Sequence, residues 1–375
     1  MVAEGCLRTF LRLCLASQGE LATCYSKTFC AHWVGQAGPV RAGRGHGMVG
    51  IREVAEAAGV SMSTVSQVVT GNRPVSAATR ARVEEAITRL GYRAHPGAAQ
   101  LRGGRTGTVA LIVPTLENPF YPLVAAGMQD VLVPRDLLLT VTDASSLDRS
   151  ASAIHRLLTR RVDAMVAAPF GLPPAGLAEV HDAGIPFVTL GQAPPGGGDY
   201  VHTNDVDGAY KVTEHLIERG RRRIAFLGGD EGVTPTRQRL EGYEKALRAA
   251  GLPVREEHVV CTRYTRQGGR DGANLLLDRD EAPDAIVAAN DLIAFGVLDV
   301  ARGRRLRVPE DLALTGYDDL EASSLVTPPL TTIMNPAREI GRACARLLLE
   351  RLDGQVSDIT RGVALSNSLV VREST

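Results

Sequence analysis

The chain has 375 residues, of which 44% are hydrophobic and 22% charged, with 42 basic and 42 acidic side chains. These values are ordinary for a folded globular protein, and they exclude collagen, coiled coil and intrinsic disorder as the main architecture. No apolar run approaches the roughly 18–20 residues that a membrane-spanning helix needs, so we do not expect an integral membrane protein.

The net charge of zero hides three segments of different charge. Residues 1–47 carry five basic and two acidic side chains, a net of +3, and residues 48–107 carry eight arginines and four glutamates, a net of +4. Residues 108–375 carry 29 basic and 36 acidic side chains, a net of −7. A basic front on an acidic body indicates that the front part binds nucleic acid.

The first 47 residues show no clear hydrophobic periodicity. They hold Cys6, Cys14, Cys24 and Cys30, whose spacing matches no zinc-binding pattern, so we expect no metal site and no cofactor there. Arg12 interrupts the short apolar run, which disfavours a signal peptide, and the few cysteines of the body favour a reducing cytoplasm. Two interpretations of this segment stay open: a disordered leader, or a start-site artefact with translation beginning at Met48.

Three helices are predicted in the basic segment, 48–93. The stretch Ile51–Ala58 has its apolar residues at i, i+3, i+4 and i+7, and Gly59 follows as a C-cap. A second helix starts after an N-cap at Ser61 or Ser63 and turns three valines inward: Val65, Val68 and Val69.

The third predicted helix, Ala77–Leu90, lies between an N-cap at Ser76 and Gly91. Two short helices joined at a glycine, with a third behind them, are typical of a helix-turn-helix unit, whose second helix enters the major groove. On pattern alone, a generic helical hairpin is the alternative.

Two stretches of this segment, "VAEAAGVSMSTVS" and "VSAATRARVEEAITRLGY", resemble the DNA-binding headpiece of the lactose-repressor/galactose-repressor (LacI/GalR) family. The resemblance extends to the C-terminal "VVREST" and covers essentially the whole chain beyond residue 47. It implies a homodimeric, effector-controlled transcriptional regulator, a repressor of sugar-metabolism genes, which reads a near-palindromic DNA operator.

The exposed start of the second helix is the predicted DNA-binding surface. The resemblance assigns base reading to Met62, Ser63 and Gln67; Gln67 stands where arginine is common and suits adenine rather than guanine. The other predicted contacts are Ser61, with Thr64 and Ser66 on phosphates. Gly50 replaces the usual threonine N-cap, so we expect the first helix to fray.

Residues 94–107 form the predicted hinge. The resemblance implies a short helix that orders on DNA and inserts Leu101 into the minor groove, where an apolar wedge unstacks a base step. Gly97 disfavours helix by about 1 kcal/mol relative to alanine. A flexible linker without contacts is the alternative.

From residue 108 onward, short apolar strands alternate with amphipathic helices, which predicts parallel sheets wrapped by helices. The length of 108–375 suits two doubly wound lobes, and the resemblance implies lobes like those of periplasmic sugar-binding proteins. Strands are predicted at Val109–Val113, Leu138–Val141, Ala164–Ala168, Phe187–Leu190, Ile224–Leu227, Val259–Thr262, Ala285–Ala288 and Leu312–Thr315. Helices are predicted at Gly208–Arg219, Arg237–Ala250 and Ile293–Arg302. An amphipathic helix is predicted from about Ala337, and the resemblance implies that it is a crossover between the lobes.

Ligands of open α/β sheets bind beyond the carboxyl ends of the strands. The resemblance places an effector, by expectation a sugar, in a cleft lined by Phe120, Tyr121, Arg237, Arg239, Tyr264, Asn290, Asp318 and Asn335. Aromatic rings stack on sugar faces, while an arginine donates to hydroxyls and an aspartate accepts from them.

Structural interpretations of these residues stay open. Asn290 and Asp291 are candidates for a helix cap, Arg239 for a surface ion pair, and Phe120 with Tyr264 for the lobe core. Two stretches depart from the family pattern, Gly191-Gln192 and Thr203-Asn204-Asp205, which leaves the identity of the sugar open.

No catalytic motif of a nucleotide-binding enzyme, serine hydrolase or zinc protease occurs in the chain, so we do not expect an enzyme. The alternatives are a sugar-binding protein or an α/β enzyme without a DNA-binding role. Since no long heptad tail follows, a dimer is favoured over a tetramer.

Overall fold

The computed structural model describes residues 49–70, 73–92, 105–168, 174–194, 196–356 and 359–375. The predictions for residues 1–47 and for Leu101 therefore lie outside the described residues. The chain divides into two compact units, Met1–His95 and Pro96–Thr375, and each is described by itself.

The first unit is a bundle of three helices: α3 (Ile51–Ala58), α4 (Met62–Thr70) and α5 (Ala77–Leu90). Its core is made by Val54, Val65 and Val83, none of which is exposed to solvent. Gly59 ends α3 in the left-handed conformation with φ 65°, as the C-cap prediction requires. The predicted bounds of the first and third helices are confirmed.

Side-chain caps fix where α4 and α5 begin. The hydroxyl of Ser61 accepts a hydrogen bond from the Thr64 amide at 3.2 Å, so Ser61 and not Ser63 is the N-cap of α4. Ser76 caps α5 in the same way. The expectation of fraying at Gly50 is wrong in this respect: the Glu53 carboxylate accepts from the Gly50 amide at 2.9 Å, which holds the helix start without a threonine.

Two predictions for α4 are wrong about exposure. Ser66 was expected on the DNA-binding surface, yet only 8% of it is exposed, whereas Val69, expected in the core, is 40% exposed. Because α4 packs against both α3 and α5, its buried arc includes Ser66, next to Val65, and leaves Val69 at the edge.

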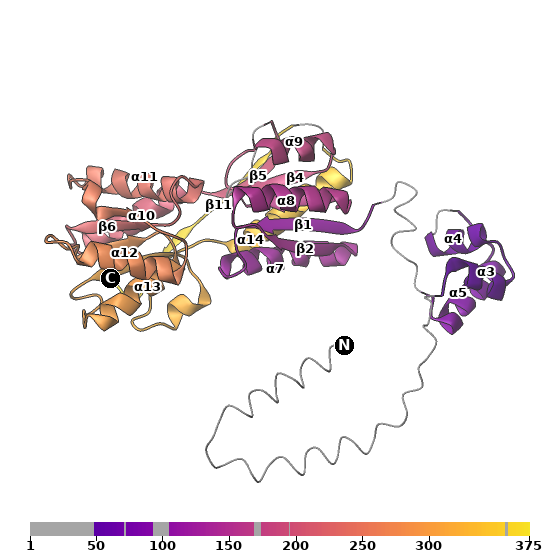
Figure 1. Ribbon diagram of the computed structural model, residues 1–375, viewed down its shortest axis with the longest axis horizontal. Helices are drawn as coiled ribbons and strands as arrows, with labels where there is room; N and C mark the ends of the chain where they lie inside the picture. Colours follow the sequence, from indigo (N-terminus) through magenta and orange to yellow (C-terminus); the bar gives the residue numbers. More distant parts are fainter. Residues whose placement is uncertain (1–48, 71–72, 93–104, 169–173, 195, 357–358) are drawn as a thin grey trace, which may run out of the picture. The chain divides into compact units, whose positions relative to one another are not determined.

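The second unit has two α/β lobes, each built on a six-stranded sheet (Figure 1). Lobe 1 has the strand order β11-β5-β4-β3-β1-β2, and all its pairs are parallel. Its strands are β1 (Thr108–Val113), β2 (Leu138–Asp143), β3 (Ala164–Ala167), β4 (Phe187–Leu190), β5 (Asp199–Thr203) and β11 (Gly362–Leu365). Its helices are α7 (Phe120–Leu132), α8 (Leu147–Thr159), α9 (Pro174–Asp182) and α14 (Ala337–Leu352).

Alternation along β1 shows how the lobe 1 sheet is covered on both faces. Val109, Leu111 and Val113 pack with α7 and α14, whereas Ala110 and Ile112 pack with α8 and α9. In Figure 1, α7 and α8 accordingly lie on opposite sides of the strands. A parallel sheet buried on both faces requires this continuous apolar strand, which is why the sequence predicted it well.

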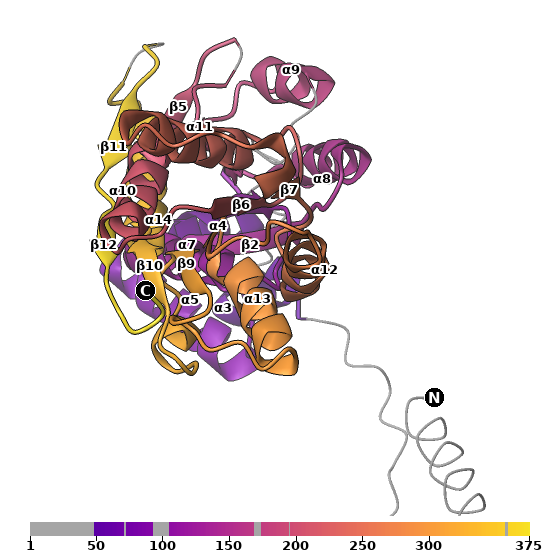
Figure 2. The same ribbon diagram turned by 90° about the vertical axis from the view of Figure 1, so that its left-hand side faces the viewer.

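Lobe 2 has the strand order β12-β10-β9-β8-β6-β7, and only β12 runs antiparallel to its neighbour. Its strands are β6 (Ile224–Gly228), β7 (Val259–Cys261), β8 (Ala285–Ala288), β9 (Ala313–Asp318), β10 (Thr331–Met334) and β12 (Ser368–Val370). Its helices are α10 (Asp205–Glu218), α11 (Thr234–Ala249), α12 (Arg266–Leu277) and α13 (Asp291–Gly303). Figure 2 shows α11 and α12 on opposite sides of β6.

Three short 3₁₀ helices are also present among the described residues, at Val133–Arg135, Glu256–His258 and Glu321–Ser324. Within the described residues, no helix is both long and apolar enough to cross a membrane.

The chain changes lobe three times, after β5, after β10 and after β11. The second change leads into α14, the crossover helix that was predicted from about Ala337, which packs on α7 of lobe 1. The strand prediction Leu312–Thr315 ended too early, since β9 runs to Asp318. Asp318 is therefore the last residue of a strand at the edge where ligands bind.

Candidate functional site

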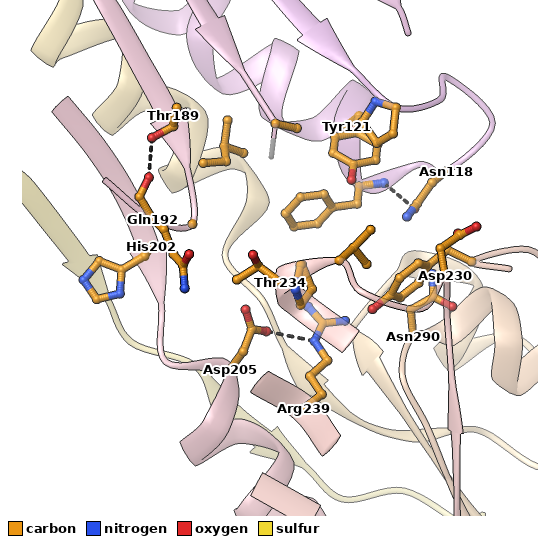
Figure 3. Close-up of a pocket in the computed structure, with 18 of the residues that line it drawn as sticks. Asn118, Tyr121, Thr189, Gln192, His202, Asp205, Asp230, Thr234, Arg239 and Asn290 are labelled. Carbon is orange, nitrogen blue, oxygen red and sulfur yellow. Dashed lines mark hydrogen bonds and ion pairs between the residues drawn. The ribbon is translucent and has the colours of Figure 1, made fainter. Parts of the chain in front are cut away.

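A cavity of about 1030 Å³ lies between the two lobes, at the carboxyl ends of their parallel strands. Lobe 1 contributes residues that follow β1, β3, β4 and β5, and lobe 2 contributes residues that follow β6, β7 and β8, together with the end of β9. Figure 3 shows side chains from both lobes converging on this space. Its size is that of a small-molecule site.

Six of the eight predicted effector residues line this cavity: Phe120, Tyr121, Arg239, Tyr264, Asn290 and Asp318. Arg237 does not line it, because two residues along α11 correspond to about 200° of rotation, and Arg237 is exposed on the far side from Arg239. Asn335 also does not line it; it lies behind Asp318 and donates to that carboxylate at 3.1 Å. Both predictions of direct lining are therefore wrong.

Arg239 is the buried cation of the described cleft, with only 6% of its surface exposed. Its Nε donates to the Asp205 carboxylate at 2.8 Å, and its Nη1 donates to the carbonyl of Ala289. Burial opposes its charge, but Asp205, Tyr264 and Tyr317 outweigh burial, and the pKa of Arg239 is raised above its ordinary value. The alternative of a surface ion pair is excluded, since the pair is buried.

Asp318 supplies a buried carboxylate across from Arg239. Burial raises its pKa to about 6, although the Arg239 charge and the Asn335 hydrogen bond both lower it. Its backbone has φ 108°, a conformation that a residue with a side chain rarely adopts. Strain of this kind is characteristic of functional positions, and here it turns a charged side chain toward the cleft.

Asn290 combines two roles that the sequence left as alternatives. Its Oδ1 accepts from the Ile293 amide at 2.9 Å, so it caps α13. Its Nδ2 is buried and, among the described residues, has no hydrogen-bond partner. Because an unpaired buried donor costs about 1–3 kcal/mol, this amide is a ready donor for a ligand in the cavity.

Aromatic rings provide the apolar walls. Phe120 packs edge-on against Tyr121, with ring centroids 5.3 Å apart, and Tyr121 extends into the lobe 1 core. Across the cleft, the Tyr264 hydroxyl lies 2.9 Å from that of Thr236. Gly229 makes room for this ring, since a Cβ there would lie 2.1 Å from it. Tyr121 and Tyr264 thus serve both as core and as lining.

Several lining residues were not among the predicted site residues. Asp205 pairs with Arg239, and Gln192, His202, Asp230 and Glu231 also line the cavity. Asp205 and Gln192 fall in the two stretches that depart from the family pattern. Within the described ranges, no group of three or more His, Cys, Asp or Glu side chains could hold a metal ion.

Most of the predicted DNA-binding residues lie at the start of α4. Met62 is 53% exposed and Ser63 is exposed, while Gln67 is half-buried. The hydroxyl of Ser61 lies 2.7 Å from that of Ser63 and 2.9 Å from that of Thr64, so the cap and its neighbours form one small network. Met62, Ser63 and Gln67 thus remain available to the surroundings, and Ser66 does not.

Both units of the chain are similar to known protein families. Residues 50–95 match the family model of bacterial regulatory proteins, lacI family, and residues 213–375 match a periplasmic binding protein-like domain. Catabolite control protein A of Priestia megaterium is 33% identical over 337 residues, which cover 87% of this chain and 99% of that protein.

Solved structures of transcriptional regulators are similar to this chain over nearly their full lengths. A complex of the transcriptional regulator CelR with cellobiose is 33% identical with a TM-score of 0.67, over 87% of this chain and 100% of that one. The Lac repressor dimer bound to operator and the anti-inducer ONPF is 28% identical with a TM-score of 0.77, over 88% of this chain and 99% of that one.

A helix-turn-helix unit joined to a two-lobed body with an interlobe cleft defines a ligand-binding transcriptional regulator. The chain belongs to the lacI family of bacterial regulatory proteins. Members of this family are DNA-binding regulators and not enzymes, so the two alternatives without a DNA-binding role are set aside.

Proposed function

We propose that this protein is a transcriptional repressor whose cleft binds a carbohydrate effector. One observation carries the proposal: Asp318, Asn290 and Arg239 of lobe 2 face the same cavity as the aromatic ring of Phe120. An ionised carboxylate accepts from neighbouring hydroxyls, an amide donates to them, and an aromatic ring stacks on the apolar face of a sugar. This combination suits a polyol.

Two relatives support the choice of ligand. The CelR structure contains cellobiose, and the Lac repressor structure contains ONPF together with operator DNA. This chain is similar to both over nearly their full lengths. We carry over only the chemical class, because the Gly191-Gln192 stretch differs from the family pattern at a place where Gln192 lines the cavity.

We further propose that two copies bind a near-palindromic operator in the bacterial cytoplasm. A two-fold dimer presents two recognition helices to two half-sites, so the symmetry of the site mirrors that of the protein. Met62, Ser63 and Gln67 of α4 would read base edges, Ser61 and Thr64 would contact phosphates, and Leu101 would insert into the minor groove.

The effector would act by binding the two arrangements of the lobes with different affinities, since a ligand without such a difference shifts nothing. Three chain segments join the lobes, and Asn335 lies in one of them with hydrogen bonds to both sides. Its Oδ1 accepts from Thr203 of lobe 1 at 3.4 Å and its Nδ2 donates to Asp318 of lobe 2. Ligand contact with Asp318 is thereby linked to the joining segments.

A mobility-shift assay tests the proposal. The full chain is titrated against DNA from upstream of its own gene, at fixed salt, with and without a panel of mono- and disaccharides. We expect a shift on a near-palindromic site that at least one sugar weakens or strengthens by ~5–150-fold, the usual range of allosteric coupling. If no DNA containing such a palindrome is retarded, the repressor assignment is wrong; if no sugar alters retardation or melting temperature, the carbohydrate assignment is wrong.

A further inference from the structure

The lining of the cleft is more acidic than a sugar site requires. Four carboxylates line its described part (Asp205, Asp230, Glu231, Asp318) against two guanidinium groups (Arg239, Arg263), which gives these six side chains a net charge of −2. Asp230 and Glu231 are exposed on the loop that precedes α11, and Arg263 is exposed beside Tyr264. An incoming ligand therefore meets carboxylates both at the rim and at the floor.

Arg239 is committed to partners within the protein. It is paired with Asp205, it donates to the Ala289 carbonyl, and its guanidinium lies over the Tyr317 ring. A buried charge that is already neutralised by its own carboxylate is a poor counterion for a second anion. The Arg239 guanidinium still has N–H donors for the hydroxyl groups of a ligand. Such hydrogen bonds depend on the direction of the donor and do not require an unpaired positive charge.

Backbone N–H groups at helix starts are the other common means of binding an anion. Four helices begin at the cleft with a lining residue and have a side chain of the protein already bound at their start. The Phe120 amide of α7 donates to Asn118 at 3.0 Å, the Asp207 amide of α10 to Asn204 at 3.1 Å, the Gly268 amide of α12 to Thr265 at 3.0 Å, and the Ile293 amide of α13 to Asn290 at 2.9 Å. No side chain caps α11, but Pro235 lacks an N–H there, and the carboxylates of Asp230 and Glu231 belong to residues three to four positions before its first residue.

The one buried polar atom of the described lining without a partner is the amide nitrogen of Asn290, and it belongs to an uncharged group. It lies among the labelled side chains around the cavity in Figure 3. A hydroxyl or ether oxygen satisfies such a donor without bringing charge into a buried, acidic site.

From this arrangement we infer that the cleft selects a neutral polyhydroxylated ligand and rejects the phosphorylated or carboxylated form of the same compound. Asp318 acts at the floor and Asp230 with Glu231 at the rim as the discriminating residues. The inference rests on the proposed function and names the subclass of ligand. Like charges placed together at an interface cost several kcal/mol, so we expect discrimination of at least ~100-fold.

The test uses full-length protein and matched sugars in isothermal titration calorimetry: glucose, galactose, ribose and cellobiose, against glucose 6-phosphate, galactose 6-phosphate, ribose 5-phosphate and glucuronate. We expect the neutral member of any binding pair to be at least ~100-fold tighter at low salt, with a smaller ratio at high salt because exposed charges are screened. An anionic member that binds as tightly as its parent would overturn the inference and leave the carbohydrate proposal standing. Absence of heat and of thermal stabilisation with all eight compounds would count against the proposed function instead.

A double variant locates the discrimination. Asp230→Asn with Glu231→Gln removes two rim charges from exposed positions, and the ratio of affinities should move at least ~10-fold toward the phosphate ester. Glu256→Gln with Asp280→Asn is the matched control, because both residues are exposed in lobe 2 and neither lines the cavity. An equal shift in both double variants, or none in either, would show that the rim does not discriminate.

Discussion

The guanidinium carbon of Arg239 lies 3.6 Å from the centre of the Tyr317 ring, so a cation of the cleft lies over an aromatic side chain of β9. The hydroxyl of Tyr317 is in turn 3.4 Å from Asn367 Nδ2, which also donates to the Asn204 carbonyl at 2.8 Å. Asn204 and Asn367 lie in two of the three segments that join the lobes. Arg239 is thus linked through Tyr317 to two of the segments that join the lobes.

Tyr317→Phe should separate ligand binding from signalling. The ring under Arg239 is kept, whereas the hydroxyl contact with Asn367 and the hydrogen bond from this hydroxyl to the Asp205 carboxylate are lost. A single hydrogen bond contributes about 0.5–1.5 kcal/mol, so we expect the ratio of operator affinities with and without effector to fall about 2–10-fold, while effector affinity changes less. Mobility shift and calorimetry measure the two quantities.

Tyr243→Phe is the control for this variant, because the Tyr243 hydroxyl donates to the Ile224 carbonyl inside lobe 2 and makes no contact with a joining segment. It removes one buried hydroxyl of the same kind. A similar loss of coupling in both variants would mean that general loosening of lobe 2, and not the Tyr317 contact, weakens the response.

Arg239→Lys should reduce effector affinity at least ~10-fold. Lysine keeps the positive charge, but it has no planar fork to bind Asp205 and Ala289 together and no flat face to lie over Tyr317. Arg237→Lys, an exposed residue two positions earlier on the same helix, should leave affinity unchanged. Calorimetry with the sugar of the panel that binds most tightly measures the affinity of both variants. Equal losses of affinity would mean that Arg237 also contributes to the effector site.

The residues that sequence analysis placed correctly follow from simple geometry. Apolar strands buried on both faces end at one edge of a parallel sheet, so Asn290 and Asp318 could be assigned to the cleft from their place after β8 and near the end of β9. Arg237 and Arg239 could not be separated without the orientation of α11. Asn335 could not be distinguished from a lining residue, because the sequence does not show that the Asp318 side chain lies between Asn335 and the cavity.

Asp205 was noted only within a stretch that departs from the family pattern and was not named as a site residue, and the strand before it, β5, was not predicted. That strand carries the polar residues Asp199, Tyr200 and His202. Asp199 is nevertheless fully buried, since Arg351 and Arg361 bind its carboxylate at 2.7 and 2.6 Å. These arginines come from more than 150 residues further along the chain, and such long-range pairing leaves no local signal in the sequence.

Effector binding should weaken as the pH falls through about 6. Asp318 accepts from hydroxyls in its ionised form, and its raised pKa means that the free protein takes up a proton there near pH 6. One pH unit below the pKa, affinity should be roughly tenfold lower. The raised pKa also means that the contribution of Asp318 to stability falls as the pH rises from about 4 to about 6, because the folded state binds this proton more tightly.

Calorimetry between pH 5 and pH 8 measures this dependence. Asp318→Asn should bind more weakly and lose most of the dependence, whereas His202→Gln, which also changes a titratable lining residue, should keep it. The buried Asp291 carboxyl interacts with Asp318, and burial raises its pKa to about 7, so it accounts for the dependence that remains. Arg239 and Asp205, which also act on Asp318, are not substituted in any of the three proteins. A dependence that disappears in the His202 variant would assign the titration to the imidazole instead.

Leu101→Ala should weaken binding to the operator much more than binding to unrelated DNA. An apolar wedge contributes only where the duplex is bent around it, and non-specific binding depends mainly on phosphate contacts. Competition mobility shifts at one salt concentration give both affinities. An equal loss on the two kinds of DNA would contradict the wedge and support a linker without contacts.

Gln67→Ala should relax sequence preference at one position in each half-site. An amide side chain pairs with adenine through N6 and N7, and loss of such a pair costs about 1–3 kcal/mol of discrimination. Ser76→Ala is the control: it removes the N-cap of α5 and destabilises the three-helix unit by about 1 kcal/mol without touching α4. We therefore expect Ser76→Ala to lower affinity for all operators alike and Gln67→Ala to reorder them. Binding to a library randomised at each half-site position distinguishes the two, and an unchanged ranking with Gln67→Ala would remove this residue from the base-reading surface.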